Sequence, residues 1–479
     1  MHVIIYDGRR KTEYVRGANM LKAIILAAGA GTRMKSKKPK VLHEVCGISM
    51  IEHVLRASES AGVSDSVVVV GHQAEVVRQE LSGRNLKFAL QLERLGTGHA
   101  AMQAAVKMPD EGTVLVLCGD TPLVRGETLA GLIRHHKEEK NSVTVLTASL
   151  DDSFGYGRII KDDDGNLLGI VEEKDADEDE RSIKEINSGM YCFDAASLKE
   201  SLKGLENGNS QGEYYLTDTV GILRGLGKRA GTYEIDDPLE ILGVNNRVQL
   251  STAEQIMKSR INIRHMLAGV TIMSPADTTI GIDVKIEPDT VVFPGSQLKG
   301  ATSIGPDCEI GPYAILENAE VGAGTKIRQS TVVDSSVGKD AKIGPYAYLR
   351  PGSIIENNVK LGDFVEVKNS TVGEGSKASH LAYIGDADIG KRVNISCGVV
   401  FVNYDGKNKH RTKVGDDVFI GCNVNLVAPV IVNNKAYVAA GTTVTEAVPE
   451  GALCIGRSRQ ENKEKWVERK WSAEYNADK

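Results

Sequence analysis

The sequence predicts an α/β domain of Rossmann-like arrangement followed by a parallel β-helix. Between residues 20 and 250, short apolar runs rich in β-branched residues alternate with longer amphipathic stretches, which is typical of a parallel sheet covered by helices. After Gly269, aliphatic residues recur at every sixth position, a period that fits a hexapeptide β-helix and neither an amphipathic helix nor a simple alternating strand. The chain of 479 residues is long enough for both domains.

Charge and cysteine content exclude several classes of protein. The 58 basic and 64 acidic residues give a net charge of −6, so the chain offers no generally basic surface to nucleic acid or an anionic membrane, and phosphate binding must be local. The seven cysteines, none closer than 25 positions to the next, exclude CxxC metal and redox motifs and indicate reduced thiols in the cytoplasm. No apolar run reaches the ~18 residues needed to cross a bilayer.

The first domain is expected over residues 20–247, after an extension of residues 1–19 that lacks the pattern of a secretory signal. Because ligands of parallel α/β sheets sit at the carboxyl ends of the strands, the residues that follow each apolar run are candidates for a site. The charge run at residues 175–181, DADEDER, is expected to be a solvated loop. The runs that predict strands are LKAIILAA, SVVVVG, NLKFALQ, TVLVLCGD and NSVTVLTASL.

The β-helix is expected over residues 270–459, after a linker helix at residues 248–269. Three hexads complete one triangular coil, in which each aliphatic residue points inward and Gly, Asn or Asp occupies a corner where positive φ is tolerated. A polar insertion, FVNYDGKNKHRTK, breaks the rhythm, and a charged tail at residues 460–479 contains Trp466 and Trp471. The two longest aliphatic series are Val337, Ile343, Leu349, Ile355, Leu361 and Val367, and Val414, Ile420, Leu426, Val432, Val438 and Val444.

A glycine-rich loop, LAAGAGTRMKSKKPK at residues 26–40, directly follows the first predicted strand. Its small residues let backbone amides approach a nucleotide, and Arg33 and Lys40 can neutralise phosphate oxygens. The loop is not a Walker loop, since GxxxxGK[ST] is absent, and it is not a GxGxxG loop, since Met34 stands at the third glycine position. Asp120 ends a later strand, a position that suits either a Mg²⁺ ligand or a turn residue.

Ordered motifs run along residues 21–457. They are LAAGxGTRM with PK, LGTGHA, CGDTPL, GYGRI, VEEKD, EINSGMY, GEYYLTD and GVNNR, and then, within the hexapeptide region, YLRPG, FVEVK, SKASHLAYIGD, NYDGKNKHRT and AAGTTV. In this order they resemble the bifunctional GlmU family. The resemblance implies an α/β nucleotide-binding (Rossmann-like) nucleotidyltransferase domain that is an N-acetylglucosamine-1-phosphate uridylyltransferase. It also implies a left-handed parallel β-helix that is a glucosamine-1-phosphate N-acetyltransferase. Together they would make UDP-N-acetylglucosamine for peptidoglycan and lipopolysaccharide.

For the uridylyltransferase, the resemblance implies that Lys40 and the loop backbone bind the UDP part. Arg33 and Lys40, with one Mg²⁺, would stabilise the charge that develops as the sugar phosphate attacks the α-phosphate of UTP. Cys118 stands where the family is expected to have a tyrosine. The implied contacts are Leu26, Ala27, Ala28, Gly29 and Asn245 with the nucleotide, Gln91, Gly96 and Thr97 with uracil, Gly157, Glu172 and Asn187 with the sugar, and Asp120 and Asn245 with Mg²⁺.

Acetyl transfer to a sugar amine needs a base, and the predicted solenoid contains two histidines, His380 and His410. His410 lies in the insertion and is expected to be exposed, while His380 without the resemblance is expected to be structural. The resemblance makes His380 the general base. It also implies that the acceptor sugar phosphate is bound by Arg350, Lys368, Tyr383 and Asn394, and acetyl-CoA by Cys397, Asn403, Tyr404, Cys422, Ala440 and Arg457. Ala and Ser are expected at the positions of Cys397 and Cys422.

Two other functions compete with this interpretation, because fold alone does not fix activity. One is a single-activity sugar nucleotidylyltransferase whose solenoid serves only for assembly; His380, Lys368 and Asn394 argue against it. The other is a non-catalytic sugar-nucleotide sensor, which the Asp120 and Asn245 pair disfavours. The resemblance further implies a homotrimer formed through the β-helix, with glucosamine-1-phosphate, N-acetylglucosamine-1-phosphate, UTP and acetyl-CoA as small-molecule partners and no nucleic-acid or membrane partner.

Overall fold

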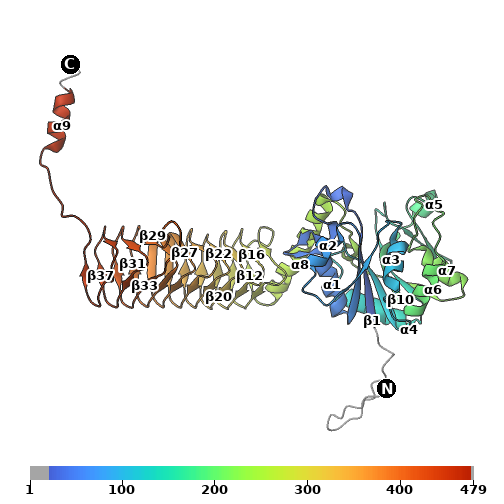
Figure 1. Cartoon of the computed structure of the whole chain (residues 1–479). Helices are drawn as coiled ribbons and strands as arrows, with labels where there is room; N and C mark the ends of the chain where they lie inside the picture. Colours follow the sequence, from blue (N-terminus) through green and yellow to red (C-terminus); the bar gives the residue numbers. More distant parts are fainter. Residues whose placement is uncertain (1–20, 476–479) are drawn as a thin grey trace, which may run out of the picture. The chain divides into compact units, whose positions relative to one another are not determined.

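The computed structural model describes residues 21–475, so the predicted extension at residues 1–19 lies outside the described residues. The chain divides into two compact units between Lys258 and Ser259. The first unit carries an α/β sheet, and the second carries a long stack of short strands (Figure 1). No helix within residues 21–475 is long and apolar enough to cross a membrane.

The first unit is built on a nine-stranded sheet with the order β11-β7-β10-β6-β1-β4-β5, and β8 and β9 form a hairpin beside β10. The strands predicted from apolar runs, which are β1, β4, β5, β6 and β7, all point in one direction. The bounds are β1 Leu21–Ala27, β4 Asp65–Val70, β5 Lys87–Leu90, β6 Thr113–Cys118, β7 Val143–Ser149, β8 Arg158–Lys161, β9 Leu167–Val171, β10 Glu185–Asp194 and β11 Ala230–Glu234, with a separate pair β2 Glu44–Val45 and β3 Ile48–Ser49.

The sheet is mixed where a wholly parallel one was predicted. Strand β10 runs antiparallel to both of its neighbours, β6 and β7. It has no continuous apolar run because residues 187–189 are Asn, Ser and Gly, and the pairing with β7 shifts register between Asn187 and Tyr191. The apolar-run pattern therefore did not predict this strand, because polar residues interrupt it at a β-bulge.

Helices cover both faces of the sheet and bury two apolar cores (Figure 1). Successive side chains of β1 point to opposite faces of the sheet. Ala23 and Ile25 belong to the core with α1, α2 and α4, and Ile24 belongs to the core with α3, α6 and α7. The helices are α1 Met50–Ser60, α2 Ala74–Glu80, α3 Thr97–Ala105, α4 Gly126–Glu138, α6 Ala195–Lys203 and α7 Asp218–Gly225, with the 3₁₀ turns η1 Thr32–Met34, η2 Lys40–Leu42 and η3 Pro238–Ile241.

The charge run at residues 175–181 was wrongly predicted to be only a loop, because it contains the short helix α5, Glu178–Arg181. Asp177 caps this helix: its carboxylate accepts a hydrogen bond of 2.8 Å from the N–H of Glu180, and the Glu180 carboxylate accepts one of 2.9 Å from the N–H of Asp177. This reciprocal capping stabilises a single helical turn in a charged, mostly exposed segment.

Strand β1 lies at the topological switch point of the sheet. The chain passes from β1 to β4 and β5 on one side and then returns to β6 on the other side of β1. The loops that follow β1 and β6 therefore leave in opposite directions and open a crevice at the carboxyl edge. Gly29 follows β1 and Asp120 follows β6, so both belong to this edge.

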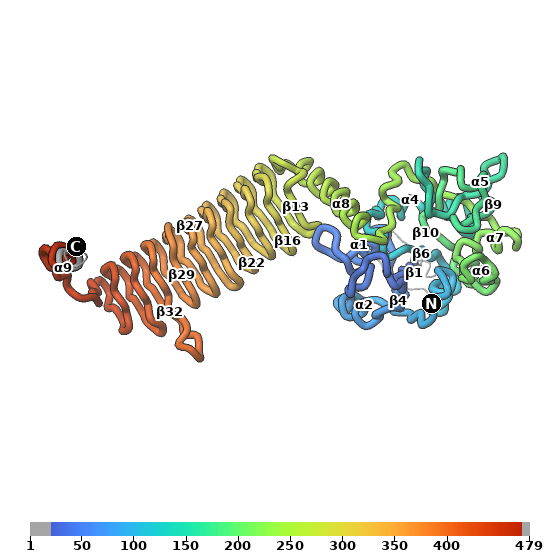
Figure 2. Tube along the Cα trace, turned by 90° about the horizontal axis from the view of Figure 1, so that it is seen from above, coloured from blue at the N-terminus to red at the C-terminus, as the bar shows by residue number. Residues whose placement is uncertain are grey.

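The second unit is a parallel β-helix whose strands stack coil upon coil (Figure 2). Its strands are β12 Thr271–Ile272, β13 Thr279–Ile280, β14 Lys285–Ile286, β15 Val291–Val292, β16 Gln297–Lys299, β17 Ser303–Ile304, β18 Glu309–Ile310, β19 Ile315–Glu317, β20 Glu320–Val321, β21 Lys326–Ile327, β22 Thr331–Val333, β23 Ser336–Val337, β24 Lys342–Ile343, β25 Tyr348–Leu349, β26 Ile354–Ile355, β27 Lys360–Lys368, β28 Thr371–Val372, β29 Lys377–Gly385, β30 Ala387–Ile389, β31 Asn394–Ile395, β32 Val400–Val402, β33 Thr412–Val414, β34 Phe419–Ile420, β35 Asn425–Val427, β36 Ile431–Val432, β37 Tyr437–Val438, β38 Thr443–Val444 and β39 Leu453–Cys454.

The register confirms the six-residue period. Leu298 of β16 pairs with Leu316 of β19, eighteen residues or three hexads later, and both series of aliphatic residues found in the sequence are buried. The polar insertion lengthens one coil, because Ile395 pairs with Ile420, twenty-five residues later. It projects from the stack after β32 (Figure 2).

Two further helices complete the second half of the chain. The segment at residues 248–269 forms α8, Arg247–Leu267, within which the two compact units divide. The tail forms α9, Trp466–Tyr475, and the side chains of Trp466 and Trp471 are exposed on it.

Candidate functional sites

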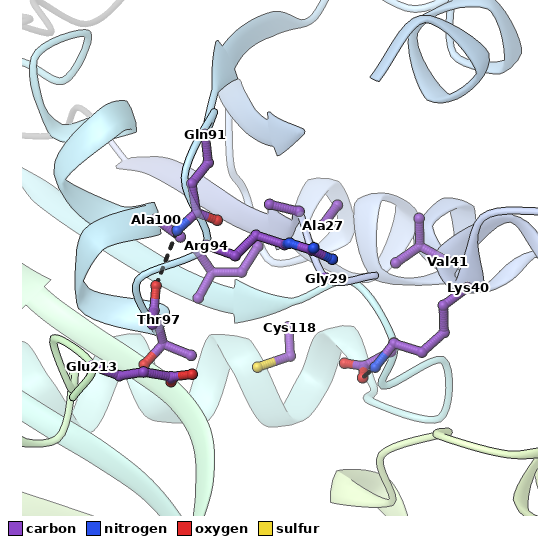
Figure 3. A pocket seen from close by; sticks show the side chains of 14 residues that line it. Ala27, Gly29, Lys40, Val41, Gln91, Arg94, Thr97, Ala100, Cys118 and Glu213 are labelled. Atoms are coloured by element: carbon purple, nitrogen blue, oxygen red, sulfur yellow. Dashed lines mark hydrogen bonds and ion pairs between the residues drawn. The ribbon is translucent and has the colours of Figure 1, made fainter. Parts of the chain in front are cut away.

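A cavity of about 290 Å³ opens at the carboxyl edge of the first sheet, where the switch point of the topology places it (Figure 3). Its walls come from the loop after β1, the start of η2, the loop after β5, the start of α3 and the loop after β6. The lining residues are Leu26, Ala27, Ala28, Gly29, Lys40, Val41, Gln91, Arg94, Gly96, Thr97, Ala100, Cys118, Asp120 and Glu213. All the implied nucleotide and uracil contacts except Asn245 are among them.

A glycine lets the loop after β1 lie against Lys40. Gly31 has φ of 59°, and a Cβ added to it would stand only 2.6 Å from the Cβ of Lys40. The Lys40 ammonium forms an ion pair with the Asp120 carboxylate and donates a hydrogen bond of 3.0 Å to Oδ1 of Asn245. The N–H of Val244 donates to the carbonyl of Asp120 at 2.9 Å, which holds Asn245 beside the end of β6.

These contacts also test whether the edge suits a divalent cation. The side-chain oxygens of Asp120 and Asn245 converge on one positive charge, the Lys40 ammonium. One carboxylate and one amide oxygen are a sufficient protein contribution for Mg²⁺, which keeps several waters and uses substrate phosphates as ligands. Residues 21–475 contain no group of three or more His, Cys, Asp or Glu that could hold a metal, so the described residues fit a lightly ligated Mg²⁺ and no all-protein cage.

The predicted uracil-binding residues form one hydrogen-bonded corner of the cavity. Nε2 of Gln91, a side chain that is 5% exposed, donates to the carbonyl of Gly96 at 3.1 Å (Figure 3). Gly96 precedes α3 with φ of 102°, and a Cβ there would approach the carbonyl oxygen of Tyr214 to 2.6 Å. The hydroxyl of Thr97 accepts from the N–H of Leu216 at 3.2 Å. This corner is tightly packed, because Gly96 leaves no room for a Cβ beside Tyr214.

The predicted sugar-binding residues lie together: Gly157 directly precedes β8, Glu172 directly follows β9, and Asn187 lies in β10. The N–H of Asn187 donates to the carbonyl of Gly157 at 2.8 Å, and a Cβ on Gly157 would lie 3.5 Å from Oε2 of Glu172. Burial raises the pKa of the Glu172 carboxyl, and the nearby carboxylates of Asp218, Asp175 and Glu213 add to this, while the Thr217 hydroxyl opposes it with a hydrogen bond of 3.2 Å.

Cys118 connects the two halves of this site. Its thiol donates to the carbonyl of Gly189 in β10 at 3.4 Å, and it also lines the cavity. Burial, reinforced by the carboxylate of Asp120, raises the pKa of this thiol to about 12. The thiol therefore stays protonated and packs as a small apolar side chain.

Arg33 does not line the cavity: it lies in η1 and is exposed, so its catalytic role stays a prediction. Arg94 and Glu213 do line the cavity and were not singled out from the sequence. Arg94 points into the cavity (Figure 3), where a guanidinium can pair with phosphate. Arg94 lies directly before the recognised motif LGTGHA, and Glu213 lies within the recognised motif GEYYLTD, so both could have been found from their neighbours in the sequence.

In the second unit, His380 lies on β29, one coil above Asp363 on β27. The two residues are paired in the parallel register of β27 and β29, and Nδ1 of His380 lies 3.4 Å from Oδ2 of Asp363. The backbone N–H of Asp363 and then the His380 ring lower the pKa of the Asp363 carboxyl. A carboxylate on one ring nitrogen orients an imidazole for proton transfer at the other.

A buried carboxylate, Asp386, joins residues predicted to bind two different substrates. It accepts a hydrogen bond of 3.3 Å from the Lys368 ammonium, and it also accepts from the amides of Asn403 and Asn369. Although burial alone would raise the pKa of Asp386, the hydrogen bonds from Asn369, Asn403 and Lys368 hold it below its usual range. Sequence reasoning missed Asp386, although it lies one coil after Lys368.

The other predicted acceptor-site residues surround this cluster. The Arg350 guanidinium donates to Glu366 at 2.8 Å, and Nδ2 of Asn403 lies 3.4 Å from the hydroxyl of Tyr383. Lys409, which the sequence analysis also missed, has its pKa lowered by the adjacent Lys368 ammonium. Lys368 and Lys409 thus lie near the end of β29 at Gly385, and His380 lies nearer its beginning at Lys377.

The remaining predicted residues of the second unit lie outside the Asp386 cluster. Cys397, Cys422 and Ala440 occupy the same corner of three successive coils, because the N–H of Asn423 donates to the carbonyl of Cys397 and the N–H of Gly441 to the carbonyl of Cys422, each at 2.8 Å. Arg457 packs on Gly441, whose added Cβ would lie 3.5 Å from its Cδ. Asn394 donates to Ser396 at 3.2 Å, and the hydroxyl of Tyr404 donates to the carbonyl of Gly406 at 2.7 Å.

Comparison with known proteins covers nearly the whole chain. The MobA-like NTP transferase domain family matches residues 23–183, and the bacterial transferase hexapeptide family, six repeats, matches residues 334–369. The bifunctional protein GlmU of Clostridioides difficile is 56% identical over 94% of this chain and 98% of its own length. Those of Alkaliphilus metalliredigens and Brevibacillus brevis are 54% and 55% identical over 94% and 92% of the chain and 98% and 96% of their own lengths.

These matches span both units and agree with a nucleotidyltransferase fold followed by a left-handed parallel β-helix of hexapeptide repeats. The chain therefore belongs to the bifunctional GlmU family, enzymes that join a nucleotidyltransferase to an acetyltransferase.

Proposed function

We propose that the chain makes UDP-N-acetylglucosamine in two steps, at a separate site in each unit. The domain expected at residues 270–459, in the second unit, transfers acetyl from acetyl-CoA to the amine of glucosamine-1-phosphate. The domain expected at residues 20–247, in the first unit, then transfers uridylyl from UTP to the resulting N-acetylglucosamine-1-phosphate and releases pyrophosphate. The convergence of Lys40, Asp120 and Asn245 at the edge of the sheet is the observation that best supports the second step.

In uridylyl transfer, the chain contributes positioning and charge. Gln91, Gly96 and Thr97 hold uracil in the cavity, and Glu172 and Asn187 hold the sugar beside β10, so that the sugar phosphate oxygen faces the α-phosphate in line. Asp120 and Asn245 would hold Mg²⁺, which when bound would neutralise phosphate oxygens. Lys40, released from Asp120, neutralises the phosphoryl oxygens as pyrophosphate leaves.

In acetyl transfer, His380 removes a proton from the substrate amine, which attacks the thioester carbonyl of acetyl-CoA, and the CoA thiolate leaves. Asp363 orients the ring and stabilises the imidazolium that forms. Arg350 and Lys368 bind the acceptor phosphate, while Asn403 and Tyr404 bind acetyl-CoA. Because Asp386 holds both Lys368 and Asn403, the two substrates would be aligned by one carboxylate.

A homotrimer formed through the β-helix is part of this proposal. Exposed apolar side chains line up on successive coils beside His380: Tyr346 is 54%, Phe364 61% and Leu381 58% exposed. The rings of Tyr346 and Phe364 are stacked with centroids 5.6 Å apart. Such a ladder suits burial against another copy of the chain. A sedimentation mass equal to a single chain would contradict it.

Assay of the intact chain separates this function from its two alternatives. With glucosamine-1-phosphate and acetyl-CoA we expect release of free thiol, and with N-acetylglucosamine-1-phosphate, UTP and Mg²⁺ we expect pyrophosphate. Pyrophosphate without thiol would identify a single-activity nucleotidylyltransferase with an assembly solenoid. Binding of the sugar nucleotide without either product would identify a sensor.

The pH dependence of sugar binding tests the role of Glu172. Its pKa is raised by burial, so this carboxyl takes up a proton, as pH falls, at a higher pH than an ordinary glutamate does. The charged acceptor for sugar hydroxyls is then lost, and we expect the KM for N-acetylglucosamine-1-phosphate to rise on the acid side while the KM for UTP changes little. In Glu172→Gln the sugar KM should be high at every pH, and a wild-type pH profile in that variant would contradict the assignment.

A further inference from the structure

Two thiols stand at the edge of the β-helix beside the proposed acetyl-CoA site. Of the seven cysteines, all of which are free and described, only Cys397 and Cys422 are exposed, whereas the others are buried or partly buried. Accessibility is the first requirement for chemistry at a thiol. These two are therefore the cysteines open to solution reagents.

The two thiols occupy equivalent places on adjacent coils. Ile395 pairs with Ile420, and each cysteine follows its isoleucine by two positions. The next residues, Gly398 and Asn423, both have positive φ, 74° and 55°, and are thus in the same corner conformation. With the backbone repeated, the two Cβ atoms leave the chain in the same direction.

Adjacent parallel strands lie about 4.8 Å apart. Cysteine Cα atoms joined by a disulfide are usually 4.4–6.8 Å apart. The hydrogen bond of 2.8 Å from the N–H of Asn423 to the carbonyl of Cys397 keeps this spacing at the corner itself. The strand spacing at this corner therefore falls within the Cα range of a disulfide.

A base stands one coil earlier in the same column. The N–H of Gly398 donates to the carbonyl of Leu381 at 2.7 Å, which places His380 opposite Cys397. Side chains in this column reach their neighbours, because His380 already contacts Asp363 in the preceding coil at 3.4 Å. An imidazole beside a thiol can accept its proton and leave the nucleophilic thiolate.

We propose that Cys397 and Cys422 form a dithiol site that reacts with low-molecular-weight disulfides and closes to an internal disulfide. The Cys397 thiolate attacks one sulfur of the reagent, forming a mixed disulfide and releasing one thiol. The Cys422 thiolate then attacks the Cys397 sulfur and releases the second thiol. Two cysteine thiols are oxidised, one reagent disulfide is reduced, and the two cysteine protons pass to the released thiols.

The consequence for activity rests on the proposed acetyl-CoA site. A bond between the two coils removes both thiols from the cofactor edge and fixes the corner next to His380. Acetyl transfer should therefore fall. Uridylyl transfer uses a site built from other residues and should continue, so the second activity of the same chain serves as the internal control.

The test treats the intact chain with oxidised glutathione in one arm and with CoA disulfide in the other. We expect peptide mass spectrometry to find Cys397 joined to Cys422 in at least one arm, which also identifies the effective reagent. In that arm acetyl transfer should fall about tenfold or more and recover with dithiothreitol, and uridylyl transfer should change less than about twofold. Absence of the joined peptide in both arms, or a mixed disulfide that stays on one cysteine, would overturn the proposal.

Three variants separate this pair from other thiols. Cys397→Ala and Cys422→Ser, each compared with its own untreated activity, should lose the oxidant sensitivity, whereas the matched control Cys454→Ser should keep it. Equal sensitivity in all three would overturn the proposal. If the joined peptide forms and acetyl transfer is unaffected, the dithiol site stands and the placement of acetyl-CoA at this edge fails.

Discussion

Asp120→Ala is expected to abolish UTP-dependent release of pyrophosphate and to leave acetyl transfer intact. Asp120 holds the Lys40 ammonium and is the one carboxylate among the proposed Mg²⁺ ligands. Electrostatic stabilisation by a bound metal is worth several kcal/mol, so its loss should lower the rate about a thousandfold or more. The measurement is pyrophosphate release from UTP and N-acetylglucosamine-1-phosphate over a range of Mg²⁺ concentrations.

The matched control is Asp163→Ala, which removes an exposed carboxylate from the same unit, in the turn between β8 and β9. It should keep wild-type rates in both assays. If Asp120→Ala lost both activities together while remaining folded, separate sites would be contradicted. If it kept pyrophosphate release, the assignment of the sheet edge as the catalytic centre would fail.

His380→Ala should lower acetyl transfer by about a hundredfold to ten-thousandfold, the usual contribution of a general base. Uridylyl transfer should be unchanged, because His380 lies in the second unit. The side chain is exposed on the β-helix, so its removal costs no core packing and stability should hold. The measurement is thiol release from acetyl-CoA in the presence of glucosamine-1-phosphate.

His410→Ala gives the comparison for this variant. His410 lies in the insertion and pairs with Asp405, whose carboxylate it approaches to 2.7 Å. We expect a loss of less than about tenfold there, because a neighbouring histidine that only stabilises a loop moves no substrate proton. An unaltered rate in His380→Ala would reject His380 as the base, and a larger loss in His410→Ala would assign the base to the insertion.

The β-helix could be predicted closely because one aliphatic residue recurs at every sixth position of the sequence. Each aliphatic residue of the series from Val337 to Val367 is buried, and one coil equals three hexads. The first unit was harder. Strand β10 carries polar residues at its bulge, so it has no continuous apolar run. Helix α5 forms within the charge run because Asp177 and Glu180 cap it reciprocally.

The site residues also differ in how well the sequence predicts them. Residues on a continuous loop, such as Ala28 and Gly29, line the cavity because they directly follow a strand whose end must face the crevice. Glu213 and Asp386 lie within the motifs GEYYLTD and SKASHLAYIGD, but their contacts depend on the fold, because Glu213 lines a cavity formed by the loops after β1, β5 and β6, and Asp386 contacts Lys368 of the preceding coil. The approach of Lys409 to Lys368 likewise depends on how the insertion folds back.

A mixing experiment decides whether one chain carries two separate sites. Asp120→Ala and His380→Ala chains are incubated separately and together with glucosamine-1-phosphate, acetyl-CoA, UTP and Mg²⁺, and UDP-N-acetylglucosamine is measured. We expect almost none from either variant alone and sustained production from the mixture, because N-acetylglucosamine-1-phosphate made by one variant diffuses to the other. No product from the mixture, with both variants folded, would contradict two independent sites.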